Sequence, residues 1–266
     1  IRRTLWRGAV AFVGLTSADK VHRASSDSKS ADFVAPVRIQ QNILAARERD
    51  ALRLLSRVLP AWIKPDHLTM LGLVGMIVAC GGYLASNWQP EFLFVSSFGL
   101  LLNWFGDSLD GTLARYRSIE RPRYGYFLDH SVDACGNFLL LFGLGSSPYV
   151  GMDVALFALT GYLLLSIYSF LTCHVSGTFH LTFLGCGPSE MRLALVALNA
   201  AMYVQGPFPL SIFGHPVSVY SLLVGGFGAM FLTIFVARTA MQARDLRGQD
   251  LSGRRASPKR RASDLP

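Results

Sequence analysis

The chain has 266 residues, of which 51% are hydrophobic and only 16% are charged. The apolar residues come in long blocks rather than in short alternating runs, which is typical of an integral membrane protein of one or two domains. The net charge is +8, but the basic residues are confined to a few clusters. This pattern argues against a nucleic-acid-binding surface and favours basic loops beside anionic membrane lipid.

The segments before the first long apolar block differ in character. Residues 1–35 mix Arg, Ser and Asp around one short apolar run, and we expect a flexible tail without a function. In residues 36–64 apolar side chains recur at helical spacing between five arginines, which predicts a basic amphipathic helix on the cytoplasmic membrane surface. Pro60 and Pro65 should end this helix, and Asp66 should cap the next one.

Six apolar segments follow, and we expect each of them to cross the membrane. They occupy residues 68–86, 92–106, a stretch beginning near Tyr124, 154–173, 189–205 and 217–237. The predicted fold class is therefore all-α and integral to the membrane. Six transmembrane helices within residues 65–240 would form the catalytic domain, and residues 241–266 would form a basic cytoplasmic tail.

The distribution of basic residues predicts the orientation of these spans. Six spans put both ends of the domain on one side of the membrane. The turns expected on the far side, residues 87–91, 145–153 and 206–216, contain no Lys or Arg. All basic clusters then lie on the near side, which the positive-inside rule assigns to the cytoplasm.

Four aspartates stand among the apolar residues at the cytoplasmic ends of the second and third spans. Asp107 and Asp110 share one helix face, and Asp129 and Asp133 share another. Ionisable residues in hydrophobic helices are costly, so they indicate a functional site. Carboxylate oxygens suit Mg²⁺ or Mn²⁺, and two such ions can clamp a phosphoryl group during its transfer. The four acids therefore indicate metal-assisted phosphoryl chemistry at the membrane surface.

Small and basic residues accompany these acids. Gly111 and Ala114 continue the face of the first pair, and Gly125 lies one helical turn before the second pair. Their small side chains leave room for a large ligand beside the carboxylates. Arg115 offers a bidentate donor for a phosphate group. One acid beyond those needed for the metal could remove a proton from a hydroxyl group.

The complete pattern resembles the signature of the CDP-alcohol phosphotransferase, or CDP-alcohol phosphatidyltransferase, family. Residues 107–115 read Asp-x-x-Asp-Gly-x-x-Ala-Arg, and residues 125–133 read Gly-x-x-x-Asp-x-x-x-Asp. Pro65-Asp66-x-x-Thr69, at the head of the first span, is similar to the start of that family's domain. Family members often have Asn where this chain has Asp66. The resemblance extends over roughly residues 50–240 and leaves out both ends of the chain.

This resemblance implies a transferase of phospholipid synthesis that releases CMP. A phosphatidyl, or substituted phosphoryl, group would pass from a CDP-linked lipid donor such as CDP-diacylglycerol to an alcohol acceptor. Asp107, Asp110 and Asp129 would hold two Mg²⁺ or Mn²⁺ ions, and Asp133 would help to bind the second ion and act as the general base. The CDP site would be formed by Thr69, Gly111, Ala114, Arg115 and Gly125. The family also implies a homodimer.

Two other functions stay open. One is transfer from a CDP-choline- or CDP-ethanolamine-type donor to a lipid alcohol. The other, of a different class, is a multi-span cation transporter, in which acids on crossed helices bind the transported ion. Transporters usually place such acids near the membrane midplane on repeated halves. This chain has no internal repeat and its acids lie toward one face, so the enzyme is favoured.

The identity of the acceptor is the least determined feature. A phosphorylated alcohol would require arginines near the acids, and the candidates are Arg117, Arg121, Arg123 and Arg192. Glu190 would instead select a cationic amino alcohol. Ser189 and Glu190 could equally stabilise the first turn of the fifth span and have no substrate role. Arg123, Glu190 and Arg192 are therefore kept as alternative acceptor-binding residues.

Overall fold

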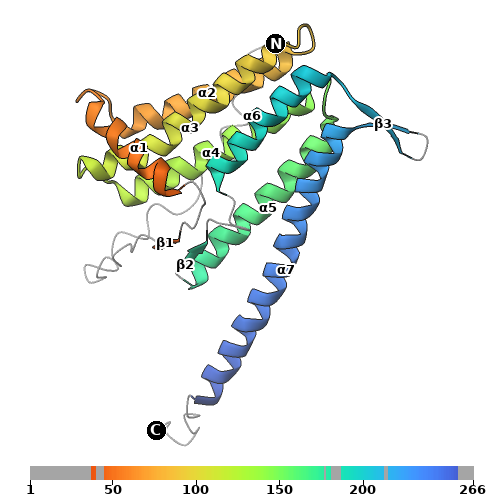
Figure 1. The fold of residues 1–266 in the computed structure, drawn as a ribbon. Helices are drawn as coiled ribbons and strands as arrows, with labels where there is room; N and C mark the ends of the chain where they lie inside the picture. Colours follow the sequence, from red (N-terminus) through yellow and green to blue (C-terminus); the bar gives the residue numbers. More distant parts are fainter. Residues whose placement is uncertain (1–36, 40–44, 177, 181–186, 213–214, 257–266) are drawn as a thin grey trace, which may run out of the picture. The chain divides into compact units, whose positions relative to one another are not determined.

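The computed structural model describes residues 37–39, 45–176, 178–180, 187–212 and 215–256 (Figure 1). Within these residues the chain is almost entirely helical, as predicted. The helices are α1 (Ala45–Val58), α2 (Pro65–Ala85), α3 (Phe92–Tyr116), α4 (Pro122–Gly145), α5 (Met152–Ser176), α6 (Pro188–Gln205) and α7 (Val219–Ala256). The expected tail of residues 1–35 lies outside the described residues.

Four of the described helices, α2, α3, α5 and α7, are long and apolar enough to cross a membrane. Together with the helical content they make this chain an all-α integral membrane protein. The other two expected spans are α4, with 24 residues, and α6, with 18. Neither α4, which carries the charged Arg123, Asp129 and Asp133, nor the less apolar α6 is among these four helices, so the count of six spans stays a prediction.

Two helix starts differ from those expected. The amphipathic helix α1 begins at Ala45 and is shorter than residues 36–64, because Val37–Ile39 form the strand β1. Two of these three residues are β-branched, which favours an extended backbone. Strand β1 pairs in parallel with β2 (Thr178–His180). Helix α2 begins at Pro65, since proline is well suited to the first helical position, so Asp66 lies in the first turn rather than at the cap.

Helix α7 continues far beyond the expected end of the sixth span. It reaches Ala256, so most of the predicted cytoplasmic tail continues the last helix. The residues after the apolar part are rich in Ala, Met, Gln, Leu and Arg, which have high helix propensity. Between α6 and α7 the strands β3 (Pro209–Ile212) and β4 (His215–Ser218) form an antiparallel pair.

The closest helix packing in the structure joins α2 to α3 (Figure 1). A Cβ atom added to Gly99 would lie 2.4 Å from the backbone nitrogen of Ala79, and one added to Gly106 would lie 2.5 Å from that of Gly72. The Ser96 hydroxyl also donates a hydrogen bond to the Ala79 carbonyl at 3.0 Å. Small residues allow this approach of two membrane helices. Asp107 follows Gly106 directly, so the packing also holds the first acids against α2.

Helix α1 packs against the C-terminal half of α3. Leu52 is buried there with Leu109 and Leu113. Arg117, at the end of α3, donates hydrogen bonds to the carbonyl oxygens of Leu59 at 2.9 Å and Ile63 at 2.6 Å. Arg117, a candidate for the acceptor site, is thus bonded to the backbone that connects α1 to α2.

Helix α4 packs against α2 and α5, and α5 packs along α7. A polar contact far from the acids fixes α6 as well: the buried Tyr83 hydroxyl donates to Asn199 Oδ1 at 2.8 Å. Helix α6 also contacts α3. Helices α2, α3, α4 and α6 are therefore held together around the acidic stretch.

The α2–α3 packing predicts unequal effects of two glycine substitutions. Gly99→Ala forces a methyl group into the backbone of α2 and should lower the free energy of unfolding by about 1–3 kcal/mol. Gly81→Ala, on α2 but with no described atom within 4 Å of the added group, should be neutral or stabilising by up to about 1 kcal/mol. Thermal unfolding of the detergent-solubilised variants measures both. Equal unfolding temperatures would contradict the importance of this contact.

Candidate active site

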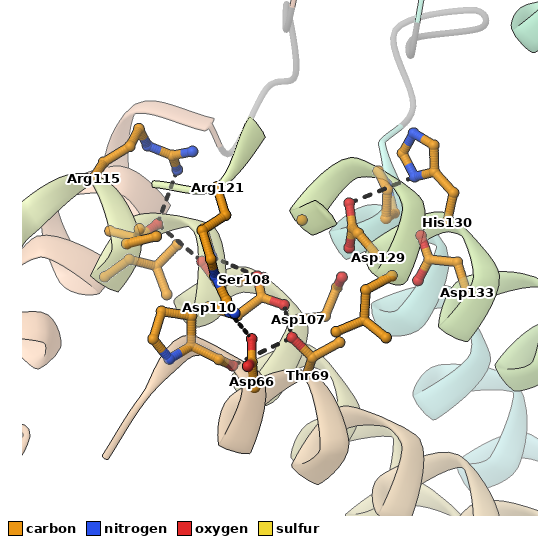
Figure 2. A pocket seen from close by; sticks show the side chains of 18 of the residues that line it. Asp66, Thr69, Asp107, Ser108, Asp110, Arg115, Arg121, Asp129, His130 and Asp133 are labelled. Atoms are coloured by element: carbon orange, nitrogen blue, oxygen red, sulfur yellow. Dashed lines mark hydrogen bonds and ion pairs between the residues drawn. The ribbon is translucent and has the colours of Figure 1, made fainter. Parts of the chain in front are cut away.

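The predicted site residues converge on one cavity of about 330 Å³, within the usual size of ligand sites. It is lined by α2, α3 and α4 and by the N-terminal parts of α1 and α6 (Figure 2). Ten of the twelve predicted residues line it: Thr69, Asp107, Asp110, Gly111, Ala114, Arg115, Gly125, Asp129, Asp133 and Arg192. Arg123 and Glu190 are described residues that do not line this cavity.

The acids of α3 are held by donors from two other elements. Asp110 Oδ2 accepts a hydrogen bond from the Thr69 hydroxyl at 2.6 Å, and its Oδ1 accepts one from the Gly111 backbone N–H. Asp107 Oδ2 accepts one from Arg192 Nη2 at 2.7 Å. The first pair of aspartates is therefore oriented by α2 on one side and by α6 on the other.

The acids of α4 lie together with His130, which was not predicted as a site residue. Asp129, His130 and Asp133 each offer a ligand atom, and these atoms lie within 4.8 Å of one another. His130 Nδ1 is 3.5 Å from Asp129 Oδ2, and the His130 ring packs against Tyr126 and Phe170. His130 lies three residues before Asp133 on the same helix, and this spacing in the sequence could have indicated that the two side chains share a face.

The chemistry of this donor set fits a divalent cation. The Asp133 carboxyl lies close enough to Asp107, Asp110 and Asp129 for their negative charges to interact. Such a group of carboxylates between apolar helices is strongly repulsive unless cations balance it. Oxygen donors, with one imidazole beside them, suit Mg²⁺ or Mn²⁺.

The two acceptor candidates on α6 have different surroundings. The Glu190 side chain accepts a hydrogen bond from the Gly187 backbone N–H at 2.9 Å, which is the helix-capping contact considered above. Arg192 is only 12% exposed and pairs with Asp107. Its Nη1 atom is buried, and no described residue accepts a hydrogen bond from it. Of the two residues, only Arg192 is thus placed to meet a ligand in the cavity.

Several cavity residues were not among the twelve predicted site residues, although Arg121 was one of the arginines first considered for the acceptor. Asp66 and Arg121 form an ion pair between the head of α2 and the start of α4 (Figure 2). The Arg121 guanidinium also lies 4.3 Å from the centre of the Tyr124 ring. Glu48 of α1 and Ser189 of α6 also line the cavity. In the sequence these charges look like ordinary surface groups, since their convergence depends on long-range contacts.

Comparison with known proteins agrees with the motif. A family model described as CDP-alcohol phosphatidyltransferase matches residues 62–238. The chain is similar to CDP-diacylglycerol--serine O-phosphatidyltransferase of Encephalitozoon cuniculi (strain GB-M1), with 33% identity over 101 residues that cover 34% of this chain and 26% of that protein.

Two archaeal proteins named archaetidylinositol phosphate synthase are similar as well. The Pyrococcus horikoshii protein is 28% identical over 116 residues, covering 44% of this chain and 58% of that protein. The Methanothermobacter thermautotrophicus protein is 28% identical over 101 residues, covering 38% and 49%. The matched stretches thus span less than two thirds of each relative. The family model, in contrast, matches more than half of this chain and includes all four aspartates. The chain belongs to the CDP-alcohol phosphatidyltransferase family.

Proposed function

We propose that the chain transfers a substituted phosphoryl group from a CDP-linked lipid to an alcohol and releases CMP. The observation that carries this proposal is the convergence of the four aspartates with Thr69 and Arg115 in one cavity. CDP-diacylglycerol is the proposed donor, a choice supported by the name of the Encephalitozoon relative. The cytoplasmic orientation of the cavity rests on the distribution of basic residues, and the homodimer stays a prediction from the family.

Metal binding is assigned to the acids of both helices. Asp107, Asp110, Asp129 and Asp133 would hold two Mg²⁺ or Mn²⁺ ions, which would offset the negative charge of the phosphates during transfer. His130, beside Asp129, can orient that carboxylate.

The nucleotide would lie where small residues widen the cavity. No described atom lies within 4 Å of a Cβ added to Gly125, so this part of α4 has open space. A Cβ added to Gly111 would lie 3.2 Å from Arg115 Nη1 and would displace the guanidinium. Gly111 thus leaves room for the Arg115 guanidinium at its present position, where we expect it to bind a phosphate of the donor, and Ala114 and Thr69 complete the proposed CDP site.

The general base of the reaction is proposed to be Asp133. Its carboxylate takes the proton of the acceptor hydroxyl, whose oxygen then attacks the phosphorus attached to the lipid. The bond from this phosphorus to the bridging oxygen breaks, and CMP leaves with that oxygen. The acceptor becomes the headgroup of the new phospholipid.

The acceptor is proposed to carry an anionic group. This is supported by Arg192, whose buried Nη1 has no hydrogen-bond partner among the described residues, while its Nη2 holds Asp107. Glu190, which would favour a cationic alcohol, bonds to the backbone outside the cavity. The names of the relatives, which mention serine and inositol phosphate, agree with a carboxylate or phosphate group.

A substrate panel tests the proposed function. The purified protein, supplied with CDP-diacylglycerol and Mg²⁺ or Mn²⁺, should release CMP with serine, inositol phosphate or glycerol phosphate but not with choline or ethanolamine. Chelation should stop the reaction, and the added metal should restore it. CMP and the lipid product are measured by chromatography. If no alcohol yields CMP, either the proposed donor or the proposed enzyme activity is wrong; transfer from CDP-choline to diacylglycerol would support the alternative instead.

The role of Asp133 is tested with an isosteric change. Asp133→Asn removes the base, so the turnover number should fall at least about 100-fold while CDP binding is largely kept. Single-turnover CMP release and equilibrium CDP binding measure the two effects. Asp153→Asn, in the first turn of α5 and outside the cavity lining, is the control. Near-normal turnover of Asp133→Asn would exclude it as the base.

The role of Arg192 is tested against that of Arg123. Arg192→Gln removes a charged hydrogen-bond donor from the cavity and should raise the KM for an anionic acceptor about tenfold or more. Arg123→Gln should change this KM little, because Arg123 does not line the cavity. Steady-state kinetics with varied acceptor measure both, and a Mn²⁺ titration checks that metal affinity is kept. A larger effect at Arg123 would reverse the assignment.

A further inference from the structure

Helix α1 contributes a carboxylate that joins three helices at the edge of the cavity. Glu48 Oε1 accepts hydrogen bonds from Trp104 Nε1 at 2.8 Å, from the Ser108 hydroxyl at 3.3 Å and from the Ser189 hydroxyl at 2.7 Å. Trp104 and Ser108 belong to α3, whereas Ser189 belongs to the first turn of α6. A single oxygen atom of α1 therefore connects α3 with the start of α6.

The partners of Glu48 lie beside the residues of the proposed acceptor site. Ser108 follows Asp107 in α3, and Ser189 precedes Arg192 by three residues in α6, so each pair is close on its helix. Arg192 Nη2 itself contacts Asp107 Oδ2 at 2.7 Å. The first turn of α6 is consequently attached to α3 at two points, through Glu48 and through the ion pair.

Glu48 is not needed to hold α1 in place. The apolar contact of Leu52 with Leu109 and Leu113 already fixes α1 to α3, and Arg117 binds the backbone that follows α1. A partly buried acid adds little stability to a surface helix that is already held by these contacts. The contact from Glu48 to Ser189, in contrast, links the described part of α1 to α6.

The Tyr83–Asn199 contact fixes α6 farther along the helix, so the ion pair from Arg192 to Asp107 would by itself leave the start of α6 poorly defined. The arginine side chain is long and has several rotatable bonds, so α6 could shift while the contact to Asp107 persists. A second contact on the same face, made by the short Ser189 side chain, limits this freedom. With Ser189 held by Glu48, the backbone at Arg192 is fixed relative to Asp107, and the guanidinium has fewer positions to adopt.

We propose that Glu48 is a positioning residue that fixes the first turn of α6, and so directs Arg192 toward the anionic group of the acceptor. This inference rests on the proposed function for the role of Arg192, but the position of α6 is measurable without turnover. Helix α1 is then a part of the substrate site as well as a helix at the membrane surface.

The test compares four variants of the full chain. Glu48→Ala removes the shared acceptor atom and Ser189→Ala removes only the link to α6. Glu48→Gln keeps an oxygen for the three donors, and its amide nitrogen replaces Oε2, which bonds to no described residue. Asp50→Ala is the matched control on α1, because the Asp50 side chain is 81% exposed.

The kinetic experiment compares the KM for the acceptor with the KM for CDP-diacylglycerol in each variant. Glu48→Ala and Ser189→Ala should raise the KM for the anionic acceptor about five- to tenfold, whereas the KM for CDP-diacylglycerol stays within about twofold. The acceptor KM of Glu48→Gln should be closer to that of the unchanged protein, and the acceptor KM of Asp50→Ala should equal it. Equal changes in both KM values, or none in the acceptor KM, would overturn the positioning role.

The second readout needs no activity. Phenylglyoxal modifies exposed arginines, and Arg192 is only 12% exposed, so its labelling should be slow in the unchanged protein. In Glu48→Ala and Ser189→Ala, phenylglyoxal should label Arg192 several-fold faster, as quantified by peptide mass spectrometry. In Glu48→Gln and Asp50→Ala the labelling rate should be unchanged. Faster labelling in a protein without transferase activity would refute the proposed function alone. Unchanged labelling in both alanine variants would refute the positioning role.

Discussion

Mutual repulsion among four aspartates is the constraint on which the rest of this structure depends. Their carboxylates face one cavity between helices that are otherwise apolar, where charges interact strongly and are poorly solvated. Each observed contact offsets part of this repulsion: Thr69 and the Gly111 N–H donate to Asp110, and Arg192 pairs with Asp107. The remaining charge is what makes the site suitable for divalent cations.

This arrangement requires a scaffold that does not yield to the repulsion. The contact between α2 and α3 supplies one, since Gly99 and Gly106 bring the two backbones together and leave no space for adjustment. The same contact places Thr69 of α2 opposite Asp110 of α3. Close packing remote from the chemistry is therefore part of how the carboxylates are positioned.

The side of the cavity that is expected to face the cytoplasm is built differently, from polar contacts between elements that are distant in the chain. Asp66 pairs with Arg121, Arg117 binds the backbone after α1, and Glu48 reaches Ser189. Charges here lie near the expected membrane surface, where water and lipid headgroups reduce the cost of exposing them. Such contacts can open and close more readily than the α2–α3 packing, as suits the side on which a soluble acceptor and CMP would pass.

Local patterns in the sequence were sufficient for the fold class, the membrane location and ten of the residues that line the cavity. The reason is that helical periodicity is local: spacings of three and four place Asp107 with Asp110, and Asp129 with Asp133, whatever surrounds them. The end of α7 and the strand Val37–Ile39 were not anticipated, because apolar periodicity does not report where a polar segment stays helical or becomes extended.

Tertiary structure alone decided which charged residues serve the site. Glu48 and Ser189 are 141 positions apart, and no spacing in the chain indicates their contact. Arg117 and Arg192 are both arginines beside expected spans, yet one binds backbone carbonyls and the other faces the cavity. Glu190 and Arg192 were equal candidates until their partners were known. The sequence by itself determined the chemistry of the acids, and the packing of distant helices decided which side chains meet them.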